Sequence, residues 1–211
     1  MKKNNPLIFF IFIFCLFICL SPRTILSADS VRVTRVIDGD TIILSDGQHV
    51  RYLGIDAPER AGKGPAEFLA QESTQFNRRL VLKKEVRLEF GQEKRDRYDR
   101  LLAYVFLDNG LFVNGELVKQ GLAHVLYHGP RMERFDELLK LQREAIQDSR
   151  GIWAKALKES EDSYRGQVHT RRFHRLDCPF GKNIAPKNLI LVQTKKEAYW
   201  QGFSPCRNCK P

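Results

Sequence analysis

The sequence predicts a mainly β fold with helices (α+β), in which a small closed barrel of five strands is followed by a small basic module. Two observations predict it. Short runs rich in β-branched and aromatic residues are separated by Gly or Asp-Gly turns such as Asp46-Gly47. The charge is also divided unevenly, because residues 29–163 carry 22 basic and 23 acidic side chains, whereas residues 164–211 carry ten basic and two acidic ones. The chain should therefore contain two units of different character.

The strand-like runs lie before and after one predicted helix, an order that small closed barrels use. The runs cover Val31–Ile37, Thr41–Leu44, His49–Ile55, Glu85–Phe90 and Leu101–Leu107. After the third run, Pro65 opens a stretch in which Phe68, Leu69, Phe76 and Leu80 share one face at a period of 3.6 residues, which predicts a helix. Two further helices are expected over Asn114–Gln120 and Met132–Gln147.

The first 28 residues have the layout of a signal peptide. Lys2 and Lys3 precede an apolar run over 7–20, and a more polar stretch ends near Ala28. Fourteen apolar residues are fewer than the about 20 that cross a bilayer as a helix. We expect a secreted or periplasmic protein; the alternative is a membrane anchor formed by residues 7–20. The remaining chain divides into a barrel domain over 29–158, a polar linker over 159–166 and a module over 167–211.

Two acidic clusters and a later arginine indicate chemistry on phosphate. The clusters are Val36-Ile37-Asp38-Gly39-Asp40-Thr41 and Arg51-Tyr52-Leu53-Gly54-Ile55-Asp56-Ala57-Pro58-Glu59, and Arg100 ends the segment Asp96-Arg97-Tyr98-Asp99-Arg100. A phosphodiester is anionic and repels hydroxide, so its cleavage requires positive charge on the phosphoryl oxygens and an oriented water. Carboxylates that hold a hard cation, a further acid and two arginines provide these groups. The sequence therefore predicts a nuclease.

These motifs resemble the staphylococcal nuclease (thermonuclease) family from about Val31 to Trp153. The resemblance rests on Asp-Gly-Asp-Thr, on Arg51 five residues before Asp56, on Ala-Pro-Glu and on Asp-Arg-Tyr-Asp-Arg-Leu-Leu-Ala-Tyr. Val113-Asn114 and the segment from Leu117 to Ala123 extend it. The resemblance implies an OB-fold barrel, a Ca²⁺ cofactor, and cleavage of DNA and RNA to products ending in 3′-phosphate.

Asp40 and Asp56 are the expected oxygen ligands of the cation. An all-oxygen ligand set favours Ca, Mg or Mn, and the resemblance selects Ca²⁺ with the backbone carbonyl of Ala57 as a further ligand. Asp38 is expected to support the site by contacting these ligands. The alternative for an Asp-Gly pair is a hairpin turn without a metal.

Glu59, Arg51 and Arg100 are the expected catalytic residues. Glu59 should orient or deprotonate the attacking water, and the sequence leaves the choice between these roles open. The two arginines can each bind phosphate oxygens with paired hydrogen bonds and stabilise the transition state. The alternative for Arg100 is a surface ion pair with Asp96 or Asp99.

Arg97, Tyr98 and Tyr127 match family positions that contact the nucleotide. The alternative for the two tyrosines is a place in the barrel core. Two departures from the family bear on substrate grip and base preference: Gly129 stands where the founding member has a tyrosine of its nucleotide pocket, and the segment between Glu59 and the first helix is shorter.

The basic tail carries four candidate metal ligands in two close pairs, His174-x3-Cys178 and Cys206-x2-Cys209. Nitrogen and sulfur ligands in this number suit a structural Zn²⁺. The alternative is a disulfide between Cys178 and one of the other two cysteines. A module this small needs a cross-link for stability, either a bound metal ion or a disulfide.

The tail also resembles the zinc-binding amino-terminal domain of the Ada alkylation-response protein, through Phe173-His174, Cys178, Gly202-Phe203 and Pro205-Cys206-x2-Cys209-Lys210-Pro211. His174 replaces the reactive first cysteine of that domain, so repair chemistry is not expected. Basic residues around the ligands favour tethering of nucleic acid through phosphates; the alternative is a solvated basic face. They are Arg171, Arg172, Arg175, Lys195, Lys196 and Arg207.

The expected partners are DNA and RNA, no protein partner is inferred, and a membrane tether follows only if the N-terminal segment is retained. Two other classes of protein are consistent with parts of the chain. A catalytically inactive OB-fold protein could bind single strands by stacking, and a tethering protein could act through its tail alone. Neither class has a need for the acids together with both arginines.

Overall fold

A computed structural model describes residues 30–62, 64–130, 132–158 and 161–211. The predicted signal segment and its anchor alternative lie outside these residues. Within them, no helix combines the length and the apolar character needed to cross a membrane.

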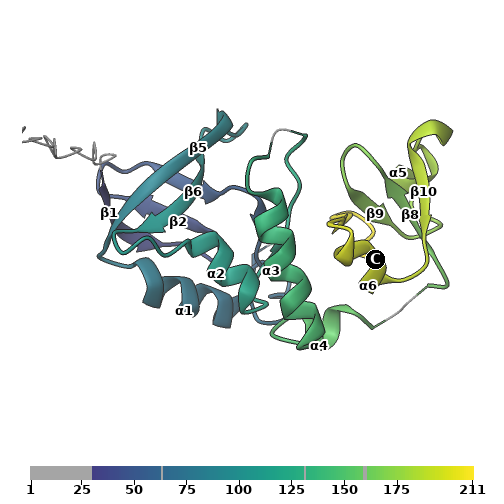
Figure 1. The fold of residues 1–211 in the computed structure, drawn as a ribbon, viewed down its shortest axis with the longest axis horizontal. Helices are drawn as coiled ribbons and strands as arrows, with labels where there is room; N and C mark the ends of the chain where they lie inside the picture. The colour runs from purple at the N-terminus through teal and green to yellow at the C-terminus, as the bar shows by residue number, and fades with distance from the viewer. Residues whose placement is uncertain (1–29, 63, 131, 159–160) are drawn as a thin grey trace, which may run out of the picture.

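The predicted five-stranded barrel is confirmed. Its strands are hydrogen-bonded in the closed order β1–β2–β3–β6–β5, and the first of them lie at the purple end of the chain in Figure 1. Their bounds are β1 Val31–Val36, β2 Thr41–Leu44, β3 His49–Tyr52, β5 Glu85–Arg95 and β6 Leu101–Leu107. All pairs are antiparallel except β3 with β6, which is parallel. Every residue of β6 is buried, because helix α2 covers the outside of this strand.

A two-stranded ribbon, β4 (Ile55–Asp56) with β7 (His124–Val125), lies beside the barrel. In it Asp56 pairs with His124. Through β4, the ribbon places Asp56, from the second acidic cluster, outside strand β3. Through β7, it connects this residue to the segment that leads into α3.

The helices of the first unit are α1 (Ala70–Val81), α2 (Val113–Lys119), α3 (Phe135–Gln147) and the short α4 (Trp153–Ala156). The expectation that the first helix begins at Pro65 was wrong. Leu69 adopts a left-handed backbone with φ 64°, and Glu67 is tied to Glu59 by two hydrogen bonds of 2.9 and 3.1 Å. These contacts hold residues 65–69 outside the helix, so Phe68 and Leu69 do not share its face.

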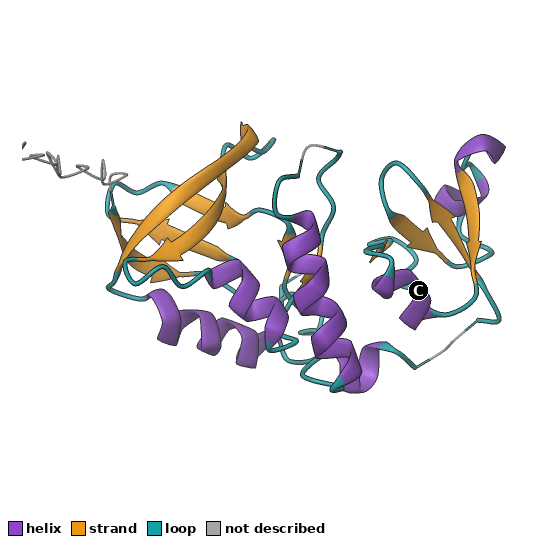
Figure 2. Ribbon diagram, in the orientation of Figure 1, coloured by secondary structure: helices purple, strands orange, loops and turns teal. Residues whose placement is uncertain are grey.

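The C-terminal unit is built on a four-stranded sheet in the order β10–β8–β9–β11, and Figure 2 shows its strands as a group apart from the barrel. The bounds are β8 Tyr164–Gln167, β9 Arg172–His174, β10 Leu189–Val192 and β11 Ser204–Pro205. Its helical segments are α5 Pro179–Lys182, the 3-10 turn η1 Pro186–Asn188 and α6 Lys195–Trp200. Strand β8 begins at Tyr164, inside the stretch 159–166 that was expected as a linker.

Helix α3 stands between the barrel and the C-terminal unit (Figure 1). On one side Leu138 packs into the barrel core, and on the other Ala145 and Ile146 pack into a second core with aromatic residues of the tail. The buried side chain of Gln142 joins both units: its Oε1 accepts from the Val125 N–H at 2.6 Å, and its Nε2 donates to the Tyr199 carbonyl at 2.6 Å. The C-terminal unit is therefore fixed against the barrel domain by burial.

Candidate functional site

The turn that follows β1 carries the first acidic cluster. Asp38 Oδ1 accepts a hydrogen bond of 3.0 Å from the Asp40 N–H, and the Asp38 carbonyl accepts one of 3.0 Å from Asn77 on α1. Asn77 is buried and also accepts from the Tyr52 hydroxyl at 2.8 Å. A β-carbon at Gly39 would overlap the Ser73 hydroxyl of α1. The turn therefore packs closely against α1, and this packing directs the Asp40 side chain into the protein interior.

Arg51 lies at the centre of the acidic residues. Its side chain is buried on β3, and its Nη1 donates to the carbonyls of Tyr52 at 2.9 Å and Ile55 at 2.8 Å. Nη2 donates to Asp56 Oδ1 at 2.6 Å, and Nη1 lies 3.2 Å from Asp40 Oδ2. One guanidinium therefore connects the two predicted cation ligands.

Ala57 lies beside them. Its N–H donates to Asp40 Oδ2 at 2.6 Å, which holds the backbone of Ala57, the third predicted ligand, next to the first. The structure thus brings together Asp38, Asp40, Asp56, Ala57 and Arg51.

The two aspartates have opposite electrostatic environments. Burial raises the pKa of Asp40 to about 8, with contributions from Asp38 and Asp56 that Arg51 opposes. Burial also acts to raise the pKa of Asp56, but Arg51, His124 and Arg207 together hold it below its usual value. A buried carboxylate whose charge is incompletely balanced gains from a bound cation. The donor set therefore fits a hard divalent cation such as Ca²⁺.

Glu59 stands at the exposed rim of this group, after the buried Pro58. Its N–H and carbonyl are both bonded to Glu67, so its backbone is fixed while its side chain reaches solvent. Desolvation raises the pKa of Glu59, and Asp56 and Asp38 raise it further. A carboxylate with a raised pKa is a better proton acceptor than an ordinary one.

Arg97, Tyr98 and Arg100 form a second group at the surface. Tyr98 is 65% exposed, and the guanidinium carbons of Arg97 and Arg100 lie 4.8 and 5.6 Å from its ring centre. Arg100 is also paired with Asp96, through contacts of 2.8 and 2.7 Å, as its alternative interpretation expected. It directly precedes β6, whose Leu101 and Leu102 pair with Val50 and Arg51 of β3. Arg100 therefore enters the strand next to the one that carries Arg51.

Tyr127 is placed against the C-terminal unit. Its ring meets Phe135 edge to face at 5.2 Å, and the Arg171 guanidinium lies 5.1 Å from its centre. In the structure this predicted nucleotide contact forms part of the interface between the two units.

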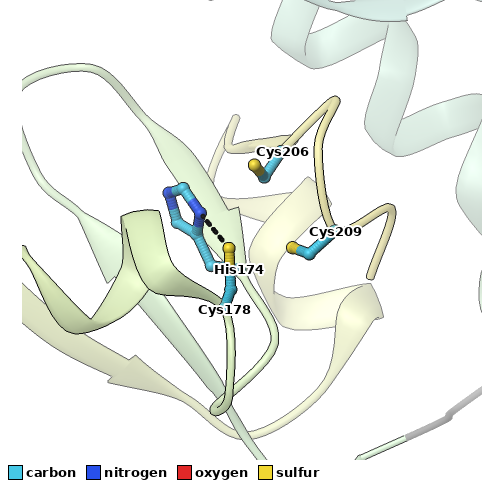
Figure 3. A group of neighbouring side chains, drawn as sticks. All are labelled: His174, Cys178, Cys206 and Cys209. Carbon is cyan, nitrogen blue, oxygen red and sulfur yellow. Dashed lines mark hydrogen bonds between the residues drawn. The ribbon is translucent and has the colours of Figure 1, made fainter.

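The four predicted zinc ligands converge from β9, the start of α5 and the segment after β11 (Figure 3). Their ligand atoms all lie within 4.8 Å of one another, and the His174 Nδ1 and Cys178 Sγ atoms are 3.5 Å apart. The thiols of Cys178, Cys206 and Cys209 form no disulfide among the described residues. Zn–S bonds of about 2.3 Å would set ligand atoms roughly 4 Å apart, so a His-Cys₃ cluster of these dimensions can hold zinc.

The C-terminal unit also reaches the acidic site. Arg207, between the last two ligand cysteines, donates from Nη2 to both carboxylate oxygens of Asp56 at 2.8 and 3.0 Å. Lys210 donates to Glu67 at 3.0 Å. Sequence reasoning placed Arg207 among the basic tail residues but missed its position at the acids. It also missed Asn77; the period of α1 assigns this polar residue to a helix, but nothing in the sequence shows that it is buried against Asp38.

Comparisons with known proteins agree with this geometry. A family model described as "Staphylococcal nuclease homologue" matches residues 49–155. The chain is 37% identical over 127 residues to a thermonuclease of Staphylococcus hyicus, covering 58% of this chain and 75% of that protein. It is 35% identical over 145 residues to endonuclease YncB of Bacillus subtilis (strain 168), covering 66% and 68%. An SPbeta prophage-derived endonuclease of that strain, YokF, is 35% identical over 181 residues, covering 83% of this chain and 56% of its own length. The last match extends beyond residues 49–155.

Proposed function

Because the chain belongs to the staphylococcal nuclease family, we propose that it is a Ca²⁺-dependent endonuclease that hydrolyses phosphodiester bonds of DNA and RNA and leaves 3′-phosphate ends. The observation that supports this proposal best is the arrangement of the buried Asp40 and Arg51 with the partly buried Asp56. A binding protein has no use for a buried arginine held between two carboxylates beside an exposed Glu59.

Ca²⁺ would be held by Asp40, Asp56 and the Ala57 carbonyl, with Asp38 fixing the turn, and when bound it supplies positive charge for the phosphoryl oxygens. Arg51 donates N–H groups to the same phosphoryl oxygens. Its side chain is buried, so water does not weaken these hydrogen bonds. Arg100 adds a second guanidinium from the neighbouring strand. Glu59 orients the attacking water or accepts its proton, which its raised pKa favours.

The substrate strand is bound outside this centre by Arg97, Tyr98 and Tyr127. Tyr98 offers an exposed ring beside two guanidinium groups. An aromatic face with positive charge next to it suits a base and the phosphate attached to it. Tyr127 can contribute only at the edge left free by Phe135 and Arg171.

For the rest of the chain, we propose that His174, Cys178, Cys206 and Cys209 bind one structural Zn²⁺ and that the protein is secreted or periplasmic. Metal analysis of the full-length protein should find one zinc per chain. In Cys206→Ser the zinc content should fall well below one, because binding needs all four ligands. A full complement of zinc in Cys206→Ser, or none in the unaltered protein, would contradict this site.

A nuclease assay with added Ca²⁺ and with a Ca²⁺ chelator tests the main proposal. Single-stranded and double-stranded DNA and RNA should be cut in Ca²⁺ and spared in chelator, and the 3′ ends of the DNA products should not prime a DNA polymerase until a 3′-phosphatase has acted. An unaltered protein that binds these substrates in Ca²⁺ without cutting them would instead be a binding protein.

A further inference from the structure

A cleft of about 410 Å³ lies between the barrel domain and the C-terminal unit, next to the acidic site. The barrel domain contributes Asp56, Glu59 and Phe68 to its lining, and the C-terminal unit contributes Tyr199, Arg207 and Lys210. Since Asp56 and Glu59 belong to the proposed nuclease site, the cleft opens onto the reacting position. The tail therefore forms part of the surface next to that position.

Arg207 is the basic residue of that surface that reaches the acids. Its Nη2 group contacts Asp56, yet 63% of its side-chain surface is exposed. A guanidinium has five N–H donors, and among the described residues Arg207 uses only Nη2. Arg207 thus lines the cleft with donors for which no partner is found among the described residues.

The backbone of Arg207 is held at both ends. Cys206 and Cys209 flank it in the four-ligand cluster, and the Cys206 N–H donates to the Phe173 carbonyl of β9 at 2.9 Å. One residue before α6 ends, the Tyr199 carbonyl accepts a hydrogen bond from Gln142, which anchors this region on α3. The backbone of Arg207 is therefore fixed beside the cleft before a ligand binds. Such preorganisation reduces the conformational entropy that is lost on binding.

Asp56 does not satisfy the full hydrogen-bonding capacity of the Arg207 guanidinium. Asp56 already accepts from the buried Arg51 at 2.6 Å, and as a proposed cation ligand it has less charge left for a second guanidinium. The Arg207 side chain of this ion pair is 63% exposed, although that of Asp56 is only 13% exposed. Water weakens an ion pair at its exposed partner, so a stronger anion can displace Asp56 from Arg207. A phosphate matches the paired geometry of a guanidinium and supplies a full negative charge.

We propose that Arg207 is a substrate-binding residue of the nuclease site, and that its guanidinium binds a phosphate of the nucleic-acid strand as the strand runs through the cleft. This inference rests on the proposed function and assigns the C-terminal unit a different role from a distant tether: it forms one wall of the substrate site. Phe68, 42% exposed on the opposite wall, provides a ring for a base of the same strand.

Binding measurements on the full-length protein test Arg207 without relying on cleavage. The probe is a single-stranded phosphorothioate oligonucleotide in Ca²⁺, followed by fluorescence anisotropy over a range of salt concentrations. Arg207→Ala should weaken binding about tenfold, which one charge-assisted hydrogen bond accounts for, and should reduce the slope of log K against log salt by about 0.7. Arg207→Lys should fall in between, because it keeps the charge but not the fork.

Lys187→Ala is the matched control. It removes one positive charge from an exposed position of the same unit that does not line the cleft, and its binding should stay within twofold of the unaltered protein. In cleavage assays Arg207→Ala should raise KM about tenfold and leave kcat within about twofold.

Three results would overturn the proposal: unchanged binding in Arg207→Ala, an equal loss in Lys187→Ala, or unchanged KM with a lower Ca²⁺ requirement in Arg207→Ala. The last would make Arg207 a counter-ion of Asp56 only. If the unaltered protein does not cut nucleic acid in Ca²⁺, the proposed function fails, and the binding titration still decides the role of Arg207.

Discussion

Among single residues, Arg51 has the most demanding position, since one buried side chain contacts Asp40, Asp56 and two backbone carbonyls. Only the planar fork of a guanidinium can reach these partners together. A lysine would carry the same charge on one nitrogen and leave some of the acceptors unpaired. The geometry of the acids and the charge offered to phosphate therefore depend on the same group.

Arg51→Lys should lower kcat by about 10²–10³, the loss found when one transition-state donor is removed. The control is Arg97→Lys on the exposed side of Tyr98, for which less than a tenfold change is expected. Steady-state kinetics at saturating Ca²⁺ measure both, with thermal melts to verify folding. Near-normal turnover in Arg51→Lys would remove this arginine from the mechanism.

The raised pKa of Asp40 predicts a pH dependence of stability in the metal-free protein. Burial holds the folded-state pKa near 8, whereas the unfolded value is about 3.9. The folded state keeps a proton that the unfolded state loses, so stability from this group is full below about pH 4 and is lost as pH rises toward 8. In chelator, Asp40→Asn should therefore melt higher than the unaltered protein at pH 8.

The difference in Tm should shrink as the pH is lowered to 5, where Asp40 is protonated and resembles the amide. Each kcal/mol corresponds to about 2–4 °C in a chain of this size. Melting curves at several pH values in chelator give the answer. A Tm difference that does not change between pH 5 and 8 would show that Asp40 has an ordinary pKa.

The predicted acidic residues and arginines lie in segments whose spacing is fixed by strands and tight turns, so their order in the chain was enough to group Asp40, Arg51 and Asp56. Arg207 could not be placed in this way. It is 151 residues from Asp56, and its position follows from how α6 packs on α3. No local pattern in the sequence encodes that packing.

At the scale of elements, helix α1 positions the first acidic turn. Asn77 on this helix links the Asp38 carbonyl to the Tyr52 hydroxyl of β3, and Gly39 allows the turn to approach Ser73. The barrel strand, the turn and the helix are thereby joined at one buried amide. Motion of α1 would be transmitted to the turn that carries Asp40, a proposed cation ligand.

Asn77→Ala should destabilise the protein by about 1–3 kcal/mol, because it leaves a buried hydroxyl and a carbonyl without partners. It should also raise the Ca²⁺ concentration needed for half-maximal cleavage. Thr74→Ala is the control on the same helix, since its hydroxyl only bonds the Ala70 carbonyl one turn away, and should change stability by less than 0.5 kcal/mol or so. Equal denaturation midpoints for the two variants would refute the link.

The strands were predicted more accurately than the first helix, and the reason is physical. The runs rich in β-branched and aromatic residues in β1 to β3, and the wholly apolar β6, favour buried strands, and buried strands build a barrel. The start of α1 is decided instead by the left-handed Leu69 and by the bonds between Glu67 and Glu59. These tertiary contacts override the helical tendency that the spacing of Phe68 and Leu69 suggests. A periodic pattern in the sequence does not report on such contacts.

At the scale of the whole molecule, α3 is shared by two hydrophobic cores, with Leu138 in one and Ile146 in the other. Between them, Gln142 pairs a backbone N–H of β7 with a backbone carbonyl of α6. The two units therefore have common structural elements, and their stabilities should be coupled.

Gln142→Ala should lower the free energy of unfolding by about 2–5 kcal/mol, since two buried backbone groups lose their partner. Gln147→Ala, an exposed glutamine on the same helix, is the control and should have an effect below about 0.5 kcal/mol. Denaturant unfolding of the full-length protein measures both. A neutral Gln142→Ala would mean that the docked arrangement does not persist in solution.

The shared helix also has a consequence for biosynthesis. During translation, α3 emerges with its barrel face matched by strands already made, but the partners of Ile146 and Trp153 include Phe203, near the end of the chain. Until those residues are synthesised, the nascent protein exposes an apolar strip on α3 that chaperones can bind. Completion of the tail should thus be the step that covers this strip.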